Sequence, residues 1–131
     1  MIRKYYIAGL AAITAAGLAG TTVTAEVTAE RLESANSESE IENWLMVHKS
    51  YDSNRYSALN QINAGNVGNL SLAFAIPIGG LEPSGFGIGY MEGTPLVDNG
   101  FMYVSDPWGT AYKIDVSSGN HGQVLWVCDT D

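Results

Sequence analysis

Cysteine is almost absent from this sequence, since Cys128 is the only one among 131 residues. A single thiol cannot close a disulfide within the chain, which excludes a small disulfide-stabilised fold. In an oxidising compartment the thiol can be buried as a small apolar group, paired with another chain, or paired with a further part of a longer protein. We favour burial, because Trp126 and Val127 precede it in a strand-like run.

Basic residues are scarce too, with six Lys and Arg against fourteen Asp and Glu and a formal net charge of −8. A strongly acidic chain repels nucleic acid and anionic lipid, and it lacks the basic patches that neutralise phosphates. We therefore expect no nucleic-acid partner. The charge favours a soluble protein, or a partner that carries positive charge.

A long hydrophobic run is also missing, because the apolar segment at residues 5–20 is shorter than the about 20 residues of a membrane-spanning helix. It follows Arg3 and Lys4, and the small residues Val-Thr-Ala come next at 23–25. The sequence therefore predicts a signal peptide at 1–25, export to the periplasm and no membrane span after cleavage. A retained N-terminal anchor is the alternative. In the mature chain four basic residues would remain against all fourteen acidic ones.

The segment after the signal is polar, and we expect a mobile leader at 26–40. Ser37 and Glu40 then have the spacing of a capping box, which predicts a short helix after residue 40. Its apolar face repeats at helical spacing: Ile41, Trp44, Leu45 and His48. We interpret the histidine as a half-buried packing residue, because no second ligand stands at a spacing suited to a metal.

A lead-in helix and loop segment is expected at 41–70, with Asn63 as the N-cap of a one-turn helix. Residues 71–78 form the first convincing strand. Residues 79–89 are a loop with five glycines, three of them in the spacing G-x-G-x-G. This is no dinucleotide fingerprint, because no helix pattern follows and Pro95 interrupts the next segment. The glycines rather allow sharp turns or close backbone approach.

Four short strands then follow at close spacing. They are expected at 94–97, 101–105, 111–115 and 124–127. Asp98-Asn99-Gly100 predicts a hairpin turn because Asn and Gly tolerate positive φ, and residues 117–119 predict another turn. Four strands within about 35 residues match one blade of a radial β-sheet repeat, so we assign 71–131 to a first propeller blade. A lone blade leaves edges and faces uncovered.

Three blocks resemble, in the same order, the pyrroloquinoline quinone (PQQ)-dependent alcohol dehydrogenases. The stretch RYSALNQIN at 55–63, with NV-x-x-L from Asn66 to Leu70, is similar to the family's RYSPL-x-QI and NV-x-x-L stretches. EGTPLV at 92–97, with Gly100 and MYV at 102–104, resembles E-[GA]-[TS]-P-[LI]-V…G-x-MYV. Residues 112–115, with Gly119 and Trp126, resemble the tryptophan-docking repeat A-L-D-x-x-x-G-x-x-x-W.

The resemblance covers about residues 43–128 and departs from the family pattern in three places. Ala58 stands where the family usually has proline, and Lys113 replaces the usual alanine. Residues 120–123 lengthen the final turn. Lys113 and the lengthened turn indicate an outlying branch.

The resemblance implies an all-β fold, an eight-bladed β-propeller of which this chain holds the first blade with its N-terminal lead-in. It also implies PQQ on the propeller axis with Ca²⁺ or a lanthanide beside it. In the family an aspartate takes the proton of an alcohol, the quinone takes the hydride, and a cytochrome c takes the electrons. The cofactor carries the redox chemistry, and the protein supplies placement and electrostatics.

Only Glu92 carries over as a functional residue, since it matches the family's early glutamate that contacts the quinone. The alternative is that Glu92 is a solvent-facing carboxylate at the end of a strand, with no functional role. The family's metal ligands, catalytic aspartate, stacking tryptophan and adjacent-cysteine disulfide belong to later segments. We therefore interpret Trp126 as a blade-packing residue and Trp108 as a turn aromatic. Asp106 and Asp115 are interpreted as turn or solvent-facing acids.

The leading hypothesis is thus the N-terminal part of an exported quinoprotein alcohol dehydrogenase, inactive by itself. The alternative from another class is a non-catalytic propeller-type binding or scaffold module that pairs with other chains. Residues 55–70 and the block at Glu92 argue against it, because a plain scaffold needs neither. A self-standing small β-domain is a third possibility, weakened by its uncovered edges.

Overall fold

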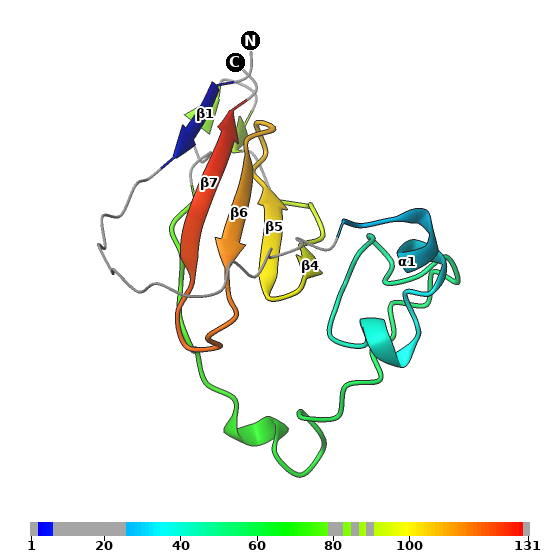
Figure 1. Ribbon diagram of the computed structural model, residues 1–131. Coiled ribbons are helices and arrows are strands. Elements are labelled where there is room, and N and C mark those ends of the chain that lie inside the picture. Colours follow the sequence, from blue (N-terminus) through cyan, green and yellow to red (C-terminus); the bar gives the residue numbers. More distant parts are fainter. Residues whose placement is uncertain (1–2, 7–25, 79–82, 85–86, 89–90, 130–131) are drawn as a thin grey trace, which may run out of the picture.

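The main element of this computed structural model is an antiparallel β-sheet (Figure 1). The structure describes residues 3–6, 26–78, 83–84, 87–88 and 91–129. Four strands follow each other as a meander in which each pairs with the next. They are β4 (Leu96–Asp98), β5 (Phe101–Ser105), β6 (Ala111–Asp115) and β7 (Gln123–Asp129). A further strand, β1 (Arg3–Tyr6), pairs antiparallel with the outer edge of β7. The chain thus forms a four-stranded meander with little helix, as the sequence pattern predicted.

Turn chemistry sets the register of the meander. Asn99 and Gly100 both adopt positive φ, 49° and 81°, which is the backbone of a two-residue hairpin turn between β4 and β5. After β6, the Asp115 carboxylate accepts hydrogen bonds from the amide and hydroxyl of Ser117, and Gly119 takes a φ of 69°. The hydrogen bonds from Ser117 lower the pKa of Asp115. Both predicted turns are confirmed.

The two faces of the sheet differ in chemistry. On one face the register aligns Leu96, Tyr103, Lys113 and Trp126 across the four strands. There the Lys113 ammonium lies 4.2 Å from the ring centroid of Phe101, and the Tyr103 and Trp126 rings are 6.3 Å apart. The other face is mainly aliphatic and also carries Tyr112; its aliphatic members include Val97, Met102, Ile114 and Val124.

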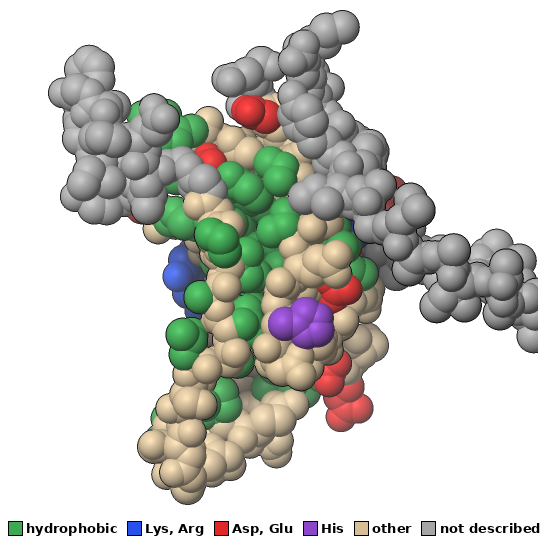
Figure 2. Space-filling view, turned by 90° about the vertical axis from the view of Figure 1, so that its left-hand side faces the viewer, with side chains coloured by type: hydrophobic (Ala, Val, Ile, Leu, Met, Phe, Trp, Pro, Cys, Tyr) green, Lys and Arg blue, Asp and Glu red, His purple; other side chains and the backbone are tan. Residues whose placement is uncertain are grey.

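The described core is small. Its buried apolar residues are Ala35, Leu45, Tyr112 and Ile114. Most other apolar side chains of the strands are only half-buried, and Figure 2 shows hydrophobic side chains gathered on one face of the molecule. Trp126 packs beside Tyr103 within the sheet, and its role between blades stays a prediction. Cys128 is half-buried, so the thiol is neither fully enclosed nor freely exposed.

The strand predicted at 71–78 is wrong. These residues run as an unpaired extended segment in which Phe74, Ile76 and Ile78 are half-buried and their neighbours are exposed. The segment passes the turn before β7, since a Cβ on Gly122 would come within 2.1 Å of Ile76. Pro77 offers no amide hydrogen for a ladder, and the outer edge of β7 is already paired with β1.

The helix predicted after residue 40 is also wrong. The N-terminal segment instead holds the helix α1 (Ala29–Glu33) and a 3₁₀ turn, η1 (Glu38–Glu40). Ser37 makes no capping hydrogen bond, and the Glu40 carboxylate binds Arg31 and Asn43 rather than a helix terminus. Trp44 is drawn out of any helix because its backbone pairs with that of Val97.

The one-turn helix of the loop is confirmed as η2 (Val67–Asn69), but Asn66, not Asn63, is its N-cap residue. The side-chain oxygen of Asn63 instead accepts from the amide of Gly65. The glycine loop contains a small hairpin of β2 (Pro83–Ser84) and β3 (Gly87–Ile88), and its other residues from 79 to 90 lie outside the described residues.

The predicted signal peptide lies almost wholly outside the described residues, which include only 3–6 of it. Among the residues that can be described, no helix is long and apolar enough to cross a membrane. The predicted limits at 25, 40 and 70 stay predictions, although α1 and η1 show that 26–40 contains local structure.

Candidate functional site

Glu92 lies four residues before β4 and is exposed. The backbone passes close to the end of β5, because a Cβ on Gly93 would lie 3.4 Å from the hydroxyl oxygen of Ser105. A Cβ at 93 would be in ordinary van der Waals contact with that hydroxyl, so the spacing does not by itself require a glycine there. The sequence therefore places an exposed carboxylate at the end of the sheet where β5 turns into β6.

A braced turn follows at this end of the sheet, built on Asp106, which is only 7% exposed. One carboxylate oxygen accepts from the amides of Trp108 and Thr110 at 2.9 and 3.0 Å. The other accepts from the hydroxyl of Tyr112 at 3.1 Å. Asp106 is thus a turn acid, as predicted, but a buried one, and its hydrogen bonds fix the loop that carries the half-exposed Trp108.

The sequence contained a sign of this turn that our interpretation did not use. Asp106-Pro107-Trp108-Gly109 has Asp at the first position, Pro at the second and Gly at the fourth, which is typical of a type I turn. Gly109 also adopts a φ of 92°. Cys128 belongs to the same end of the sheet, since the register aligns it with Ala111, and Ala111 with Ser105.

A second cluster lies at the opposite end of β4 and was not predicted. Arg31 binds the Glu40 carboxylate through Nε and Nη2, at 2.7 and 2.9 Å, and the Asp98 carboxylate through Nη2 at 2.7 Å. Asn43 donates to Glu40 at 2.7 Å. No local sequence pattern predicts this cluster, because its members are far apart in the sequence and meet only in the folded chain.

Ion pairing and burial shift the pKa values of the charged side chains in this cluster. Hydrogen bonds from Arg31 lower the pKa of Glu40, and those to Glu40 and Asp98 raise the pKa of Arg31. Lys49 is 3% exposed, and its ammonium donates to the backbone carbonyls of Glu40 and Asn43. Burial lowers the pKa of this lysine. These groups hold one another in place.

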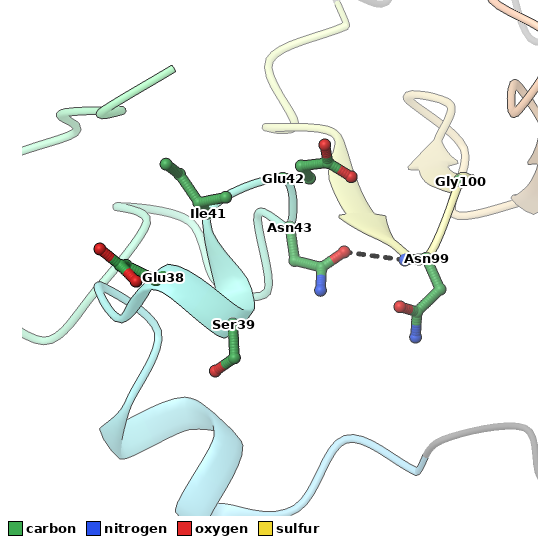
Figure 3. A pocket seen from close by; sticks show the side chains of 7 residues that line it. All are labelled: Glu38, Ser39, Ile41, Glu42, Asn43, Asn99 and Gly100. Carbon is green, nitrogen blue, oxygen red and sulfur yellow. Dashed lines mark hydrogen bonds between the residues drawn. The ribbon is translucent and has the colours of Figure 1, made fainter.

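A shallow pocket opens between this cluster and the turn from β4 to β5. Figure 3 shows it from close by, with the amide of Asn99 donating to the side-chain oxygen of Asn43 at 2.8 Å. The lining is polar and acidic: Glu38, Ser39, Ile41, Glu42, Asn43, Asn99 and Gly100. The Asn43 side chain donates to Glu40 and accepts from the amide of Asn99, so it links the cluster to the turn.

His48 does not pack as predicted. It is exposed, and its Nδ1 accepts a hydrogen bond from Arg55 at 2.9 Å. Within the described ranges, no group of three or more His, Cys, Asp or Glu side chains could hold a metal ion. The described part of the chain therefore offers one exposed carboxylate beside a glycine loop, and no metal site.

The sequence of this chain matches a known protein family. Residues 44–131 match the PQQ family described as "Glucose/ethanol/alcohol dehydrogenase, beta-propeller domain". The chain is 37% identical over 87 residues to the dehydrogenase subunit of the quinone alcohol dehydrogenase of Gluconacetobacter polyoxogenes, covering 66% of this chain and 10% of that protein.

Two methanol dehydrogenases are similarly related. Subunit 1 of the methanol dehydrogenase [cytochrome c] of Methylobacterium organophilum is 37% identical over 86 residues, which are 65% of this chain and 12% of that protein. The lanthanide-dependent methanol dehydrogenase of Methylacidiphilum fumariolicum (strain SolV) is 37% identical over 117 residues, 88% of this chain and 18% of that protein. The matched region of this chain thus spans between a tenth and a fifth of the length of these relatives.

Proposed function

This chain belongs to the PQQ β-propeller family of glucose, ethanol and alcohol dehydrogenases, and we propose that it forms the N-terminal part of an exported quinoprotein that oxidises an alcohol in the periplasm. The observation that carries the proposal is the match of residues 44–131 together with Glu92 at its position in that region. The meander from β4 to β7 would be the first of eight blades.

Glu92 would make the contact of this chain with PQQ. The described residues fit one such contact, because the Glu92 carboxylate is exposed and the adjacent Gly93 lies beside Ser105 at the end of β5. When bound, PQQ supplies the acceptor for a hydride from the alcohol. The role of Glu92 is to orient the quinone through a charge-assisted hydrogen bond, which is stronger than a neutral one.

The braced turn on Asp106 would support this contact from the next strand connection. Its buried hydrogen bonds give the end of the sheet a fixed shape, and a site on rigid elements is more precise than one on free loops. We assign no catalytic residue and no metal ligand to this chain. Those groups, with the Ca²⁺ or lanthanide, would come from the remainder of the propeller.

Relatives guide the choice of metal and acceptor. One is named a lanthanide-dependent methanol dehydrogenase and another a methanol dehydrogenase [cytochrome c]. By analogy, the whole protein would use Ca²⁺ or a lanthanide and pass electrons to a cytochrome c. The 131-residue chain by itself would be inactive, because it spans a small part of the relatives.

Alcohol-dependent dye reduction tests the proposal. The complete product of the gene and the 131-residue chain are each supplied with PQQ and Ca²⁺ or a lanthanide. We expect a product that continues into further Trp-ended repeats and an adjacent-cysteine pair, and turnover by that product only. Turnover by the 131-residue chain would contradict its proposed inactivity. A longer product that neither binds PQQ nor turns over would favour the scaffold module.

A further inference from the structure

The outer edge of β4 is covered by the N-terminal segment rather than by a strand. A free strand edge presents unpaired N–H and C=O groups to which another chain can add. Here Trp44 donates to the carbonyl of Val97 at 2.8 Å and accepts from its amide at 3.0 Å. Val97 is the central residue of β4, so both of its backbone groups that face away from β5 are satisfied.

Three consecutive residues of the hairpin are held by three different residues of the N-terminal segment. Val97 pairs with Trp44, as above. Asp98 accepts from Arg31 at 2.7 Å, and the amide of Asn99 donates to the side chain of Asn43 at 2.8 Å. Figure 1 places this segment beside β4, on the side of the sheet away from β7.

The segment is also held together internally. Glu40 binds both Arg31 and Asn43, so the two side chains that reach the hairpin share one buried carboxylate. Lys49 closes the segment by donating to the carbonyls of Glu40 and Asn43. It does so with a φ of 72°, a conformation that a non-glycine residue keeps only where its surroundings hold it.

We propose that residues 26–53 form an edge cap of β4. The cap occupies the edge of the four-stranded meander that no strand of the described residues covers. It fixes the position of this three-residue strand and blocks the addition of any other strand there. This inference does not depend on PQQ or on Glu92. Its observations are the contacts of Arg31, Glu40, Asn43 and Trp44, and Arg31 and Glu40 lie before residue 44, where the match to the family model begins.

Amide hydrogen exchange of the full 131-residue chain tests the cap directly. In the wild-type chain we expect the Val97 amide to be protected, because it donates to Trp44. Arg31→Met should accelerate its exchange at least about tenfold, while the Ile114 amide in β6 keeps its protection. The matched control is Arg55→Met, which removes an equal charge from an arginine that bonds to His48.

The cap is refuted if Val97 exchanges freely in a wild-type chain whose β6 amides are protected, or if the two arginine variants accelerate it equally. If Arg31→Met also accelerates exchange of the Ile114 amide, that variant has unfolded. Asp98→Asn then takes its place, because it leaves the pair of Arg31 and Glu40 intact. It should accelerate exchange at Val97 and not at Ile114. Sedimentation provides a second measurement: the uncapped variant should self-associate more strongly than Arg55→Met. Equal association would overturn the blocking role.

Discussion

The guanidinium of Arg31 lies 2.7 Å from the carboxylate of Asp98, although 67 residues separate them in the sequence. Asp98 ends β4 and opens the turn to β5, whereas Arg31 belongs to the short helix α1. Both side chains are largely shielded from solvent, at 18% and 15% exposure. This ion pair joins the N-terminal segment to the sheet, and its strength can be measured.

A double-mutant cycle on Arg31→Met and Asp98→Asn should give a coupling of about 1 kcal/mol, because the pair is short and partly buried. Urea unfolding of the wild-type chain, the two single variants and the double variant measures it. The cycle of Arg55→Met with Asp98→Asn is the control and should show no coupling. Strictly additive effects of Arg31 and Asp98 would contradict the pairing.

Acid should weaken the cap through Glu40. Arg31 holds the pKa of this carboxyl below its ordinary value of 4.5. A carboxyl whose pKa is lower in the folded state than in the unfolded state stabilises the fold at any pH above its unfolded-state pKa. This stabilisation is lost as the pH falls from the unfolded-state pKa through the folded-state pKa. We expect the free energy of unfolding to be level near neutral pH and to fall below about pH 4.5.

Urea unfolding at stepwise pH measures this loss for the wild-type chain, Glu40→Gln and Glu38→Gln. The acid-dependent loss should shrink in Glu40→Gln, which removes the titrating group. It should persist in Glu38→Gln, because Glu38 is exposed in the same 3₁₀ turn. Equal acid sensitivity of all three proteins would argue against Glu40 as its source.

Asp106→Ala should destabilise the chain by about 2 kcal/mol, because it removes the carboxylate that accepts hydrogen bonds from two part-buried amides and one buried hydroxyl. Tyr112→Phe removes only the last of these bonds and should cost about 1 kcal/mol. Thermal or urea unfolding compares the two variants. If Tyr112→Phe proves as damaging as Asp106→Ala, the amides of Trp108 and Thr110 do not depend on this carboxylate.

Gly100→Ala should be the more damaging of two matched glycine substitutions. Both Gly100 and Gly119 have positive φ, 81° and 69°, so an alanine is strained at either. At Gly100 the new Cβ would also come within 2.9 Å of the Ser117 side chain, whereas at Gly119 nothing lies within 4 Å. Backbone strain alone costs about 1 kcal/mol, and the clash should add at least that much.

Unfolding free energies of the two alanine variants measure the difference directly. Similar values for both would show that the backbone at Ser117 shifts without cost.

Local chemistry explains which elements the sequence predicted. The strands at 101–105 and 111–115 are found with the predicted bounds, because short apolar runs bounded by turn residues such as Asn99 and Gly100 define them locally. The segment predicted as a strand at 71–78 is also mainly apolar, but it pairs with no strand edge. A strand requires a neighbour, and its own residues do not supply one.

The cap escaped prediction for the same physical reason. Ile41, Trp44 and Leu45 have helical spacing, yet the backbone of Trp44 pairs with Val97, 53 positions further along the sequence. Ser37 and Glu40 have the spacing of a capping box but form none, because the Glu40 carboxylate accepts hydrogen bonds from Arg31 and Asn43. Glu92 was found only through the family resemblance, since no local pattern distinguishes it from other exposed acids.

Titration of PQQ into the metal-loaded apo form of the complete gene product tests the central claim most directly. We expect binding that Glu92→Gln weakens at least about tenfold, since a hydrogen bond to a charged group contributes about 1.5–3 kcal/mol. Glu33→Gln, which removes an exposed acid of α1, should bind PQQ like the wild type. Unchanged affinity in Glu92→Gln, or no binding of PQQ by the wild-type protein, would contradict the account.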